Sequence, residues 1–227
     1  MAADKSAEAT FRLLWETEES ARSTLSVGGI VEAAIALADA EGLGAVSMQR
    51  VAGELGYTAM ALYRHVPGKD QLVALMADRA QGSPPAESGK EWRSEILDWA
   101  DAAWEFYLAH PWMLRVATTG APTGPNELAW FEALLRPLAR SGLAAENLVA
   151  TAMFLSSAVR DLARIATEIV PSGSDYGNLL ARVVQPDRFP TLASLMASGV
   201  VEDDGDVRPA LDFGLKILLD GLAPRTS

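Results

Sequence analysis

Apolar residues along most of the chain recur at intervals of three and four positions, which is the spacing of one face of an α-helix. The first example follows a candidate N-cap at Ser26 and stops at Gly42, and the longest covers residues 145–169. The alternation of apolar and polar residues that is typical of strands is absent from the sequence. The pattern therefore predicts an all-α protein with about nine or ten helices.

Two short helices are predicted within residues 47–69, SMQRVAGELGYTAMALYRHVPGK. Ser47 and Thr58 stand at their N-cap positions, and a turn of about three residues containing Gly56 joins them. This is the geometry of a helix-turn-helix, whose second helix places its N-terminal residues in the major groove of DNA. An ordinary corner between two helices has the same spacing, so the spacing alone leaves both interpretations open.

The side chains of these two helices favour DNA binding. Leu62 and Val66 can face the core of a small domain, which turns Met60 and Tyr63 outward. Met60 can contact a thymine methyl group and Tyr63 can donate to a phosphate. Lys69 begins the next predicted helix, where free N–H groups also attract an anion. The further candidates for contact with bases or phosphates, taken from the residues alone, are Gln49, Arg50, Ala59 and Arg64.

The run AAIALADAEGLGAVSMQRVAGELGYTAMALYRHVPGKDQLVALMADRA resembles the N-terminal DNA-binding domain of TetR-family transcriptional repressors. The segments YLAHPWM, GPNELAWFEALL and FGLKILLDGL are similar to elements of the tetracycline-repressor-like C-terminal domain, so the resemblance covers roughly residues 10–222. The resemblance implies that nine positions approach bases or phosphates, and some of them are already candidates from the residues alone. These positions are Ser47, Gln49, Thr58, Ala59, Met60, Ala61, Tyr63, His65 and Lys69.

Two features of this sequence differ from the family pattern of DNA contacts. Relatives with a similar N-terminal segment often have an Arg-rich arm before the first helix, whereas ETEESARST offers only Arg22. Ala59 and Ala61 are too short for bidentate reading of a base, so specificity has to rest on other side chains and on DNA shape. Tyr63 and His65 also have a purely structural interpretation, as packing residues of the small domain.

The chain divides best at residues 81–91, QGSPPAESGKE, which are rich in Gly, Ser and Pro. We expect a charged N-terminal extension at residues 1–25 and a three-helix DNA-binding domain of helix-turn-helix type at residues 26–80. Residues 81–227 are expected to be a helical bundle for ligand binding and dimerisation. The long helix at 145–169 and the last helix at 211–222 are the predicted interface of a homodimer.

The resemblance also implies an effector pocket in the second domain, which is rich in Trp and Phe. Most of these rings are expected to be core, since a stripe at helical spacing usually packs. Arg160 and Asp161 interrupt an apolar helix as an exposed pair, an interface pair or the polar anchors of the pocket. The candidate lining residues are Trp99, Phe106, Trp112, Met113, Phe131, Met153, Phe154 and Arg160.

The net charge of −11 at first argues against a nucleic-acid partner, but its distribution does not. Residues 47–69 hold Arg50, Arg64 and Lys69 against Glu54, which gives +2 there and −13 elsewhere. Such a small cationic patch implies few phosphate contacts per subunit and a dependence on the dimer. The expected partners are therefore double-stranded DNA, a small-molecule effector and a second copy of the chain.

Other classes of protein have little support in the sequence. The chain has no Cys, no secretory signal and no apolar stretch long enough to cross a membrane, so a cytoplasmic protein is expected. No GxxxxGK[ST], HExxH or GxSxG motif occurs, and His110 is expected to end a helix rather than to bind a metal. We expect no cofactor and no metal. The alternatives are a small-molecule-binding protein with a non-functional DNA-binding domain and, with least support, an all-α enzyme.

Overall fold

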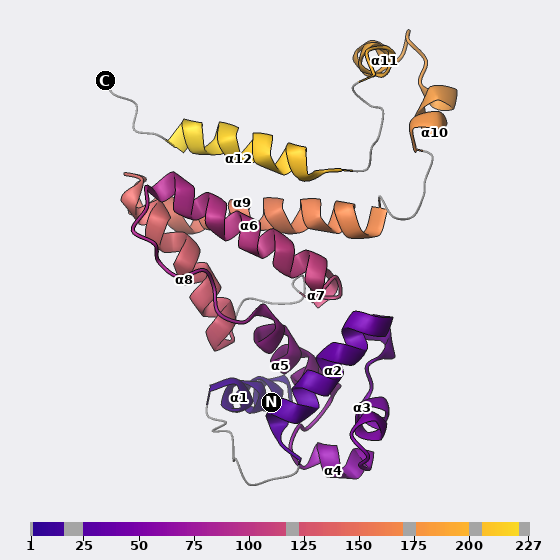
Figure 1. Cartoon of the computed structure of the whole chain (residues 1–227), viewed down its shortest axis with the longest axis vertical. Coiled ribbons are helices and arrows are strands. Elements are labelled where there is room, and N and C mark those ends of the chain that lie inside the picture. Colours follow the sequence, from indigo (N-terminus) through magenta and orange to yellow (C-terminus); the bar gives the residue numbers. More distant parts are fainter. Residues whose placement is uncertain (1, 16–24, 117–122, 170–175, 200–205, 223–227) are drawn as a thin grey trace.

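The computed structural model describes residues 2–15, 25–116, 123–169, 176–199 and 206–222 (Figure 1). In these ranges the chain forms twelve α-helices and no strand, so the predicted all-α class is confirmed. The number of helices exceeds the expected nine or ten, and one of them, α1, lies in residues that were expected to form a charged extension. Among the described residues, no helix is long and apolar enough to cross a membrane.

The N-terminal half contains α2 (Val27–Glu41), α3 (Met48–Glu54), α4 (Ala59–Tyr63) and α5 (Lys69–Gln81), which we call the head. The Ser26 hydroxyl accepts the N–H of Gly29 at 3.1 Å, and the Ser47 hydroxyl accepts that of Arg50 at 3.2 Å. Both predicted N-caps are therefore formed. Gly42 and Gly56 adopt positive φ values of 81° and 75°, which favour glycine, at the ends of these helices.

The core of the head lies between these four helices. Leu62 and Val66 are fully buried, as their spacing predicts. Apolar side chains of α2, α3 and α5 surround them, among them Ile30, Val51 and Met76. The same cluster includes two residues from the second half of the chain, which are described below.

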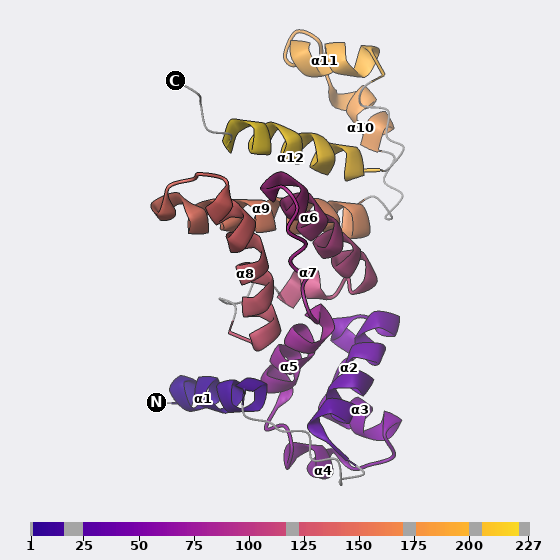
Figure 2. The same cartoon turned by 60° about the vertical axis from the view of Figure 1, so that its left-hand side comes forward.

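The second half is built around α6 (Trp92–Ala109), α8 (Pro125–Arg140), α9 (Ala145–Arg164) and α12 (Arg208–Leu222), which we call the body. Two shorter segments complete the body, α7 (Met113–Val116) and a π-helical turn, η2 (Ile165–Ile169). Figure 2 shows α6, α8 and α9 crossing one another, with α12 lying along α9. The core of the body consists of apolar residues from all four long helices, including Ile96, Leu134, Leu138, Leu155 and Leu211.

Two further helices, α10 (Tyr176–Val183) and α11 (Pro190–Ala197), stand away from the rest of the chain (Figure 1). Val183, Phe189 and Leu195 are exposed there, and α11 contains no buried residue. The acidic stretch EDDGD, residues 202–206, lies outside the described residues apart from Asp206.

The expected charged extension is partly helical, which corrects the sequence-based expectation. Helix α1 (Ala2–Trp15) packs on α5, and Leu13 and Leu14 lie against the core of the head. The Trp15 indole N–H donates to the carbonyl of Thr123 at 2.9 Å. The apolar group at residues 11–15 thus drives packing of this helix onto the protein. Arg22 lies outside the described residues.

Candidate DNA interface and effector domain

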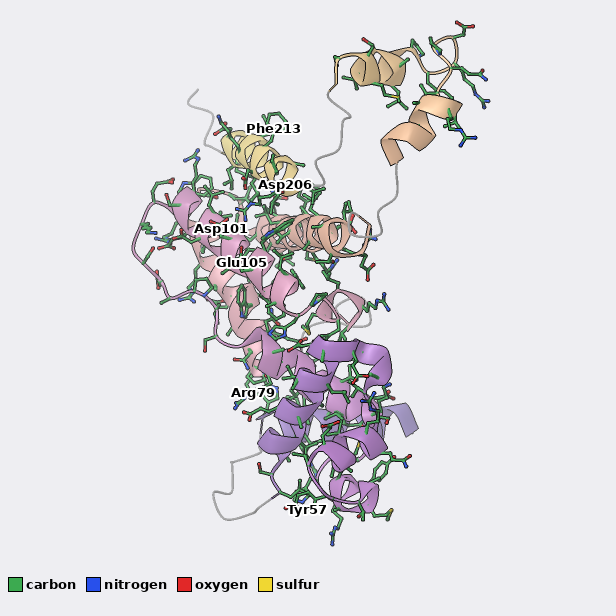
Figure 3. All side chains as sticks on the ribbon, turned by 45° about the vertical axis from the view of Figure 1, so that its right-hand side comes forward. Tyr57, Arg79, Asp101, Glu105, Asp206 and Phe213 are labelled. Carbon is green, nitrogen blue, oxygen red and sulfur yellow. The ribbon has the colours of Figure 1, made fainter. Side chains whose placement is uncertain are left out.

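The two helices of the helix-turn-helix form an open groove at the tip of the head. Five of the DNA-contact candidates line this groove, together with Tyr57, which Figure 3 shows at the end of the molecule. The five are Ser47, Gln49, Thr58, Ala59 and Tyr63. Residues that lie up to 16 positions apart are therefore brought to one surface by the turn between α3 and α4.

Large apolar side chains on α4 are exposed as the sequence predicts. Met60 is 74% exposed and Tyr63 is 46% exposed. Helix α4 spans only Ala59–Tyr63, and the Thr58 side chain, predicted to be its N-cap, makes no capping hydrogen bond. The Thr58 hydroxyl is therefore not used by the backbone at the start of α4 and lies exposed beside the groove.

Ala61 does not lie on this surface. It is only 8% exposed and packs in the core of the head next to Leu62. Each helical residue turns by about 100°, so a position two residues after Ala59 points to the opposite side of α4. This corrects its expected role as a DNA-contact residue. His65, at the end of this segment, is half-buried.

Arg50 is exposed but paired. Its two terminal nitrogens each lie 2.8 Å from a carboxylate oxygen of Glu41, at the end of α2. The hydrogen bonds from Arg50 hold the pKa of Glu41 below its usual value, and those same bonds raise the pKa of Arg50. By contrast, within the part of the chain that the structure describes, Arg64 and Lys69 have no carboxylate partner in ion-pair distance.

Two of the expected effector-binding residues belong instead to the contact between body and head. Trp112 and Met113 are buried in the core of the head. The Trp112 indole donates to the Asp39 carboxylate of α2 at 2.7 Å, and His110 Nδ1 lies 2.8 Å from the same oxygen. Trp112 and Met113 therefore pack at the contact between the body and the head, next to the end of α6. This corrects their assignment to a pocket. His110 does cap α6, as expected of a residue at a helix end.

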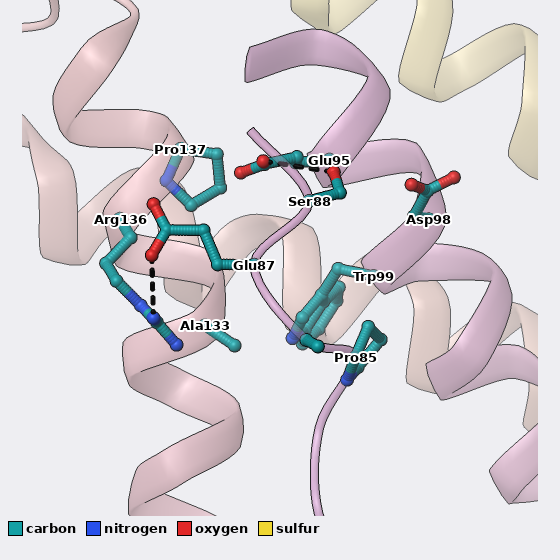
Figure 4. A pocket seen from close by; sticks show the side chains of 10 residues that line it. Pro85, Glu87, Ser88, Glu95, Asp98, Trp99, Ala133, Arg136 and Pro137 are labelled. Carbon is teal, nitrogen blue, oxygen red and sulfur yellow. Dashed lines mark hydrogen bonds and ion pairs between the residues drawn. The ribbon is translucent and has the colours of Figure 1, made fainter. Parts of the chain in front are cut away.

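Three other effector candidates lie together in the body. Trp99 and Trp130 meet edge to face with centroids 6.0 Å apart, and Phe106 lies 6.3 Å from Trp130. Phe131 is partly buried and packs on the same core. Trp99 also lines a small cavity of about 20 Å³ beneath residues 85–88, where Glu87 and Arg136 pair at 3.3 Å (Figure 4). That volume holds a single water rather than an effector.

The charge of Arg160 acts on the phenol of Tyr107, which is partly buried. The pKa of Tyr107 is raised by burial and lowered in part by Arg160. Tyr107 packs against both the head and the body cores. Within the described ranges, Arg160 donates only to the Ser157 hydroxyl, at 3.4 Å, whereas Asp161 pairs with Arg164 at 2.9 Å. The two neighbours therefore do not form a pair with each other.

Met153 and Phe154 point away from the interior. They are 60% and 62% exposed on α9, so they do not line a cavity with the aromatic residues of the body. This corrects the expected pocket. Other apolar side chains are exposed on α9 and α12, and Figure 3 shows Phe213 at the opposite end of the molecule from Tyr57. We refer to these exposed residues of the two helices together as the apolar face; they are Val149, Met153, Phe154, Phe213 and Ile217.

Several residues that join head and body were not identified from the sequence. Asp39 and Asp78 lie on helices of the head and accept hydrogen bonds from the body, and Asn126 and Trp130 donate from α8 to α5. The sequence does contain a sign that Asp78 is buried. It lies three residues after Leu75, on the apolar face of α5, and one helical turn from the end of that helix. No group of three or more potential metal ligands occurs among the described residues.

An all-helical chain with an exposed helix-turn-helix at one end and a helical bundle at the other is the architecture of a DNA-binding transcriptional regulator. Residues 30–76 match the family described as bacterial regulatory proteins, tetR family. Residues 84–226 match the tetracyclin repressor-like C-terminal domain. The chain belongs to the TetR family of transcriptional regulators, as the resemblance implied.

Two curated proteins and one solved structure are similar to this chain over most of its length. The HTH-type transcriptional repressor DrrR1 of Streptomyces coeruleorubidus is 34% identical, over 94% of this chain and 84% of that protein. An HTH-type transcriptional regulator of Saccharopolyspora erythraea is 29% identical, over 92% and 89%. The structure of ActR from Streptomyces coelicolor in complex with actinorhodin superposes with a TM-score of 0.74 and 28% identity, covering 89% of this chain and 99% of that one.

Proposed function

We propose that this regulator is a repressor that binds a two-part operator as a homodimer and is released by a small, largely apolar effector. The observation that carries the proposal is the groove between α3 and α4, beside which Met60 and Tyr63 are exposed. A protein gains nothing from exposing these side chains to water, whereas DNA offers them thymine methyl groups and phosphates.

The proposed roles at the operator follow from chemistry and exposure. Met60 and Ala59 contact bases, with Gln49 hydrogen-bonding to a base edge. Phosphates are contacted by hydroxyl groups and by the cations that lack a carboxylate partner among the described residues. The phosphate-binding set is Ser47, Thr58, Tyr63, Arg64, His65 and Lys69, joined by Arg50 once it leaves Glu41.

The apolar face of α9 and α12 supports a homodimer. Its five residues are too large and too apolar to remain in water, and they lie on the two helices expected to pair. Two such faces meeting across a two-fold axis form a four-helix bundle. A dimer then presents two heads, whose separation selects operators with half-sites spaced accordingly.

The aromatic residues of the body support an effector with planar rings. ActR, which shares this fold, is known in complex with actinorhodin. The body of this chain contains Trp99, Phe106, Trp130 and Phe131 close together, with Tyr107 and Arg160 as polar groups nearby. An effector bound among them favours a conformation in which the heads no longer match the operator. As a regulator of bacterial genes the protein acts in the cytoplasm.

Selection of operators from a random duplex pool, followed by footprinting, tests this proposal. Wild type is expected to enrich a two-fold symmetric sequence. Tyr63→Ala and Lys69→Ala are expected to lose most of the protection, while Lys90→Ala, a matched change in the body, keeps it. Failure of the wild type to select any sequence would support the alternative, a small-molecule-binding protein with a non-functional head.

A further inference from the structure

A buried carboxylate of the head holds the start of a helix of the body. Asp78, on α5, is only 6% exposed. Its Oδ1 accepts the backbone N–H groups of Asn126 at 2.8 Å and Glu127 at 3.1 Å, and its Oδ2 accepts the side-chain amide of Asn126 at 3.0 Å. The same amide also donates to the Asp78 carbonyl at 3.1 Å.

The first turn of helix α8 depends on this carboxylate because its N-cap residue, Gly124, has no side chain to accept hydrogen bonds. The first N–H groups of a helix need acceptors from outside the helix, and the N-cap residue here is Gly124. Glu127 accepts the N–H groups of Thr123 and Gly124, at 2.8 and 3.0 Å. Asp78 accepts the next two. The cap of α8 is thus supplied by another helix, and a negative charge there also suits the helix dipole.

The contact requires a glycine at position 124 because a side chain there would collide with Asp78, and not because the backbone conformation is unusual. Its φ of −81° and ψ of 156° are open to any residue. A Cβ atom at this position, however, would lie 2.1 Å from Asp78 Oδ1, and the closest three atoms around it all belong to Asp78. A side chain at position 124 and the Asp78 carboxylate would therefore occupy the same space. Only one of the two positions can carry the side chain that caps α8.

A second contact fixes the same two helices one turn further along. The Trp130 indole N–H is shared between the carbonyls of Gln81 and Gly82, at 3.0 Å each, where α5 ends. Asn126 and Trp130 are four residues apart and so lie on one face of α8. Helix α5 is consequently held to α8 along a face, and not at a single point.

We propose that Asp78 is the positioning residue that transmits the position of α8 to the DNA-binding surface. This inference rests on the proposed function. Helix α5 starts at Lys69 beside the DNA-contact surface and reaches Asp78 about 14 Å further on, at the usual rise per residue. Helix α8 carries Trp130 and Phe131 into the aromatic region of the body. A shift of α8 therefore reorients α5, and with it the head.

The test moves the cap from one helix to the other. In the double variant Asp78→Gly with Gly124→Asp, α8 regains a carboxylate cap from its own N-cap residue, the net charge is unchanged, and the bond to α5 is gone. Asp78→Asn keeps the shape of the side chain but loses its charge. Ser26→Ala, which removes an N-cap inside the head, is the control for lost stability alone.

Three measurements separate positioning from stability: thermal unfolding, affinity for a selected full operator, and affinity for a duplex with one half-site. Because the chain has no Cys, Glu54→Cys gives one spin label on each head, and pulsed EPR then reports the distance between heads in a dimer. Glu54 is exposed on α3.

For the double variant we expect unfolding near that of wild type, half-site affinity within about twofold, and full-operator affinity at least about tenfold weaker, because two heads no longer bind as one unit. The distribution of distances between heads is expected to broaden. Ser26→Ala is expected to lower the unfolding temperature while the ratio of full-site to half-site affinity stays as in wild type.

A wild-type ratio and a wild-type distance distribution in the double variant would overturn the inference. So would an equal loss of half-site and full-site affinity, because Asp78 would then act on the fold of the head itself. If wild type itself binds the full operator no better than one half-site, the proposed function fails, and this inference with it.

Discussion

Arg50 and Glu41 form a two-pronged ion pair, with both terminal nitrogens of the guanidinium 2.8 Å from the carboxylate oxygens. The pair joins the end of α2 to the first turn of α3 and neutralises one of the three cations in residues 47–69. Both side chains are half-exposed, so the pair adds little to stability. Its main consequence is electrostatic, because it limits how much positive charge the head offers to DNA.

Glu41→Gln is therefore expected to strengthen binding to DNA of unrelated sequence. Release of Arg50 lets its guanidinium neutralise a phosphate, and each additional phosphate neutralised steepens the plot of log affinity against log salt concentration by about 0.9. Fluorescence anisotropy of a labelled duplex across a salt series measures the slope. Glu54→Gln changes the net charge equally and leaves the hydrogen bonds between Arg50 and Glu41 in place, and an equal slope in both variants would contradict the prediction.

Phe213→Asp is expected to convert the dimer to a monomer. Phe213 is exposed on α12 within the apolar face, and a charge placed there would have to be buried at the proposed interface without a partner. Light scattering after gel filtration gives the mass, and operator affinity is expected to fall with it. Leu128→Asp places the same charge at an exposed leucine of α8 and serves as the control. If the Phe213→Asp protein were still a dimer, the dimer interface would have to lie on another part of the surface.

Much of the fold was predictable from local patterns. The N-caps at Ser26 and Ser47 and the glycine at position 56 depend only on neighbouring residues, and the structure contains all three features. The exposure of Met60 beside the burial of Leu62 follows from helical spacing alone. Helix α1 was missed because its charged residues conceal the apolar face that packs on α5.

The contacts between head and body were not predictable in this way. Trp112 and Asp39 are 73 residues apart, and Asp78 and Asn126 are 48 apart. Periodicity shows that Trp112 is buried but not which of two cores buries it. Similarly, the pattern of α9 gives its apolar positions without distinguishing a pocket from an interface, so Met153 and Phe154 were assigned to the pocket. Such assignments depend on long-range packing that a local pattern does not encode.

Met60→Ala is expected to change the operator and not the fold. An exposed side chain contributes little to stability, so the free energy of unfolding should change by less than about 0.5 kcal/mol. Loss of contact with a thymine methyl group relaxes base preference at one position of each half-site. Selection from a random duplex pool reads this out. Leu62→Ala, two residues away and fully buried, is expected to cost about 2–5 kcal/mol. If the Met60→Ala protein selected the same bases as wild type, Met60 would not be a base-contacting residue.

The pH dependence of stability tests the environment of Asp78. Burial raises the pKa of this carboxyl above its usual value of 3.8, against the opposing effect of the N–H groups of Glu127 and Asn126. Folding therefore favours the protonated form. The contribution of Asp78 to stability is fully present below pH 3.8 and is lost as the pH rises through the folded-state pKa.

Wild type should consequently gain stability relative to Asp78→Asn as the pH falls from about 7 toward 4. The pKa values of Glu41 and Glu95 are lowered, so their contributions are lost on acidification, but they are common to both proteins and cancel in the difference. Urea denaturation of the two proteins at a series of pH values gives this difference directly. A difference that shrinks on acidification would mean that the hydrogen bonds from α8 outweigh burial, and that the Asp78 carboxylate is held in its charged form.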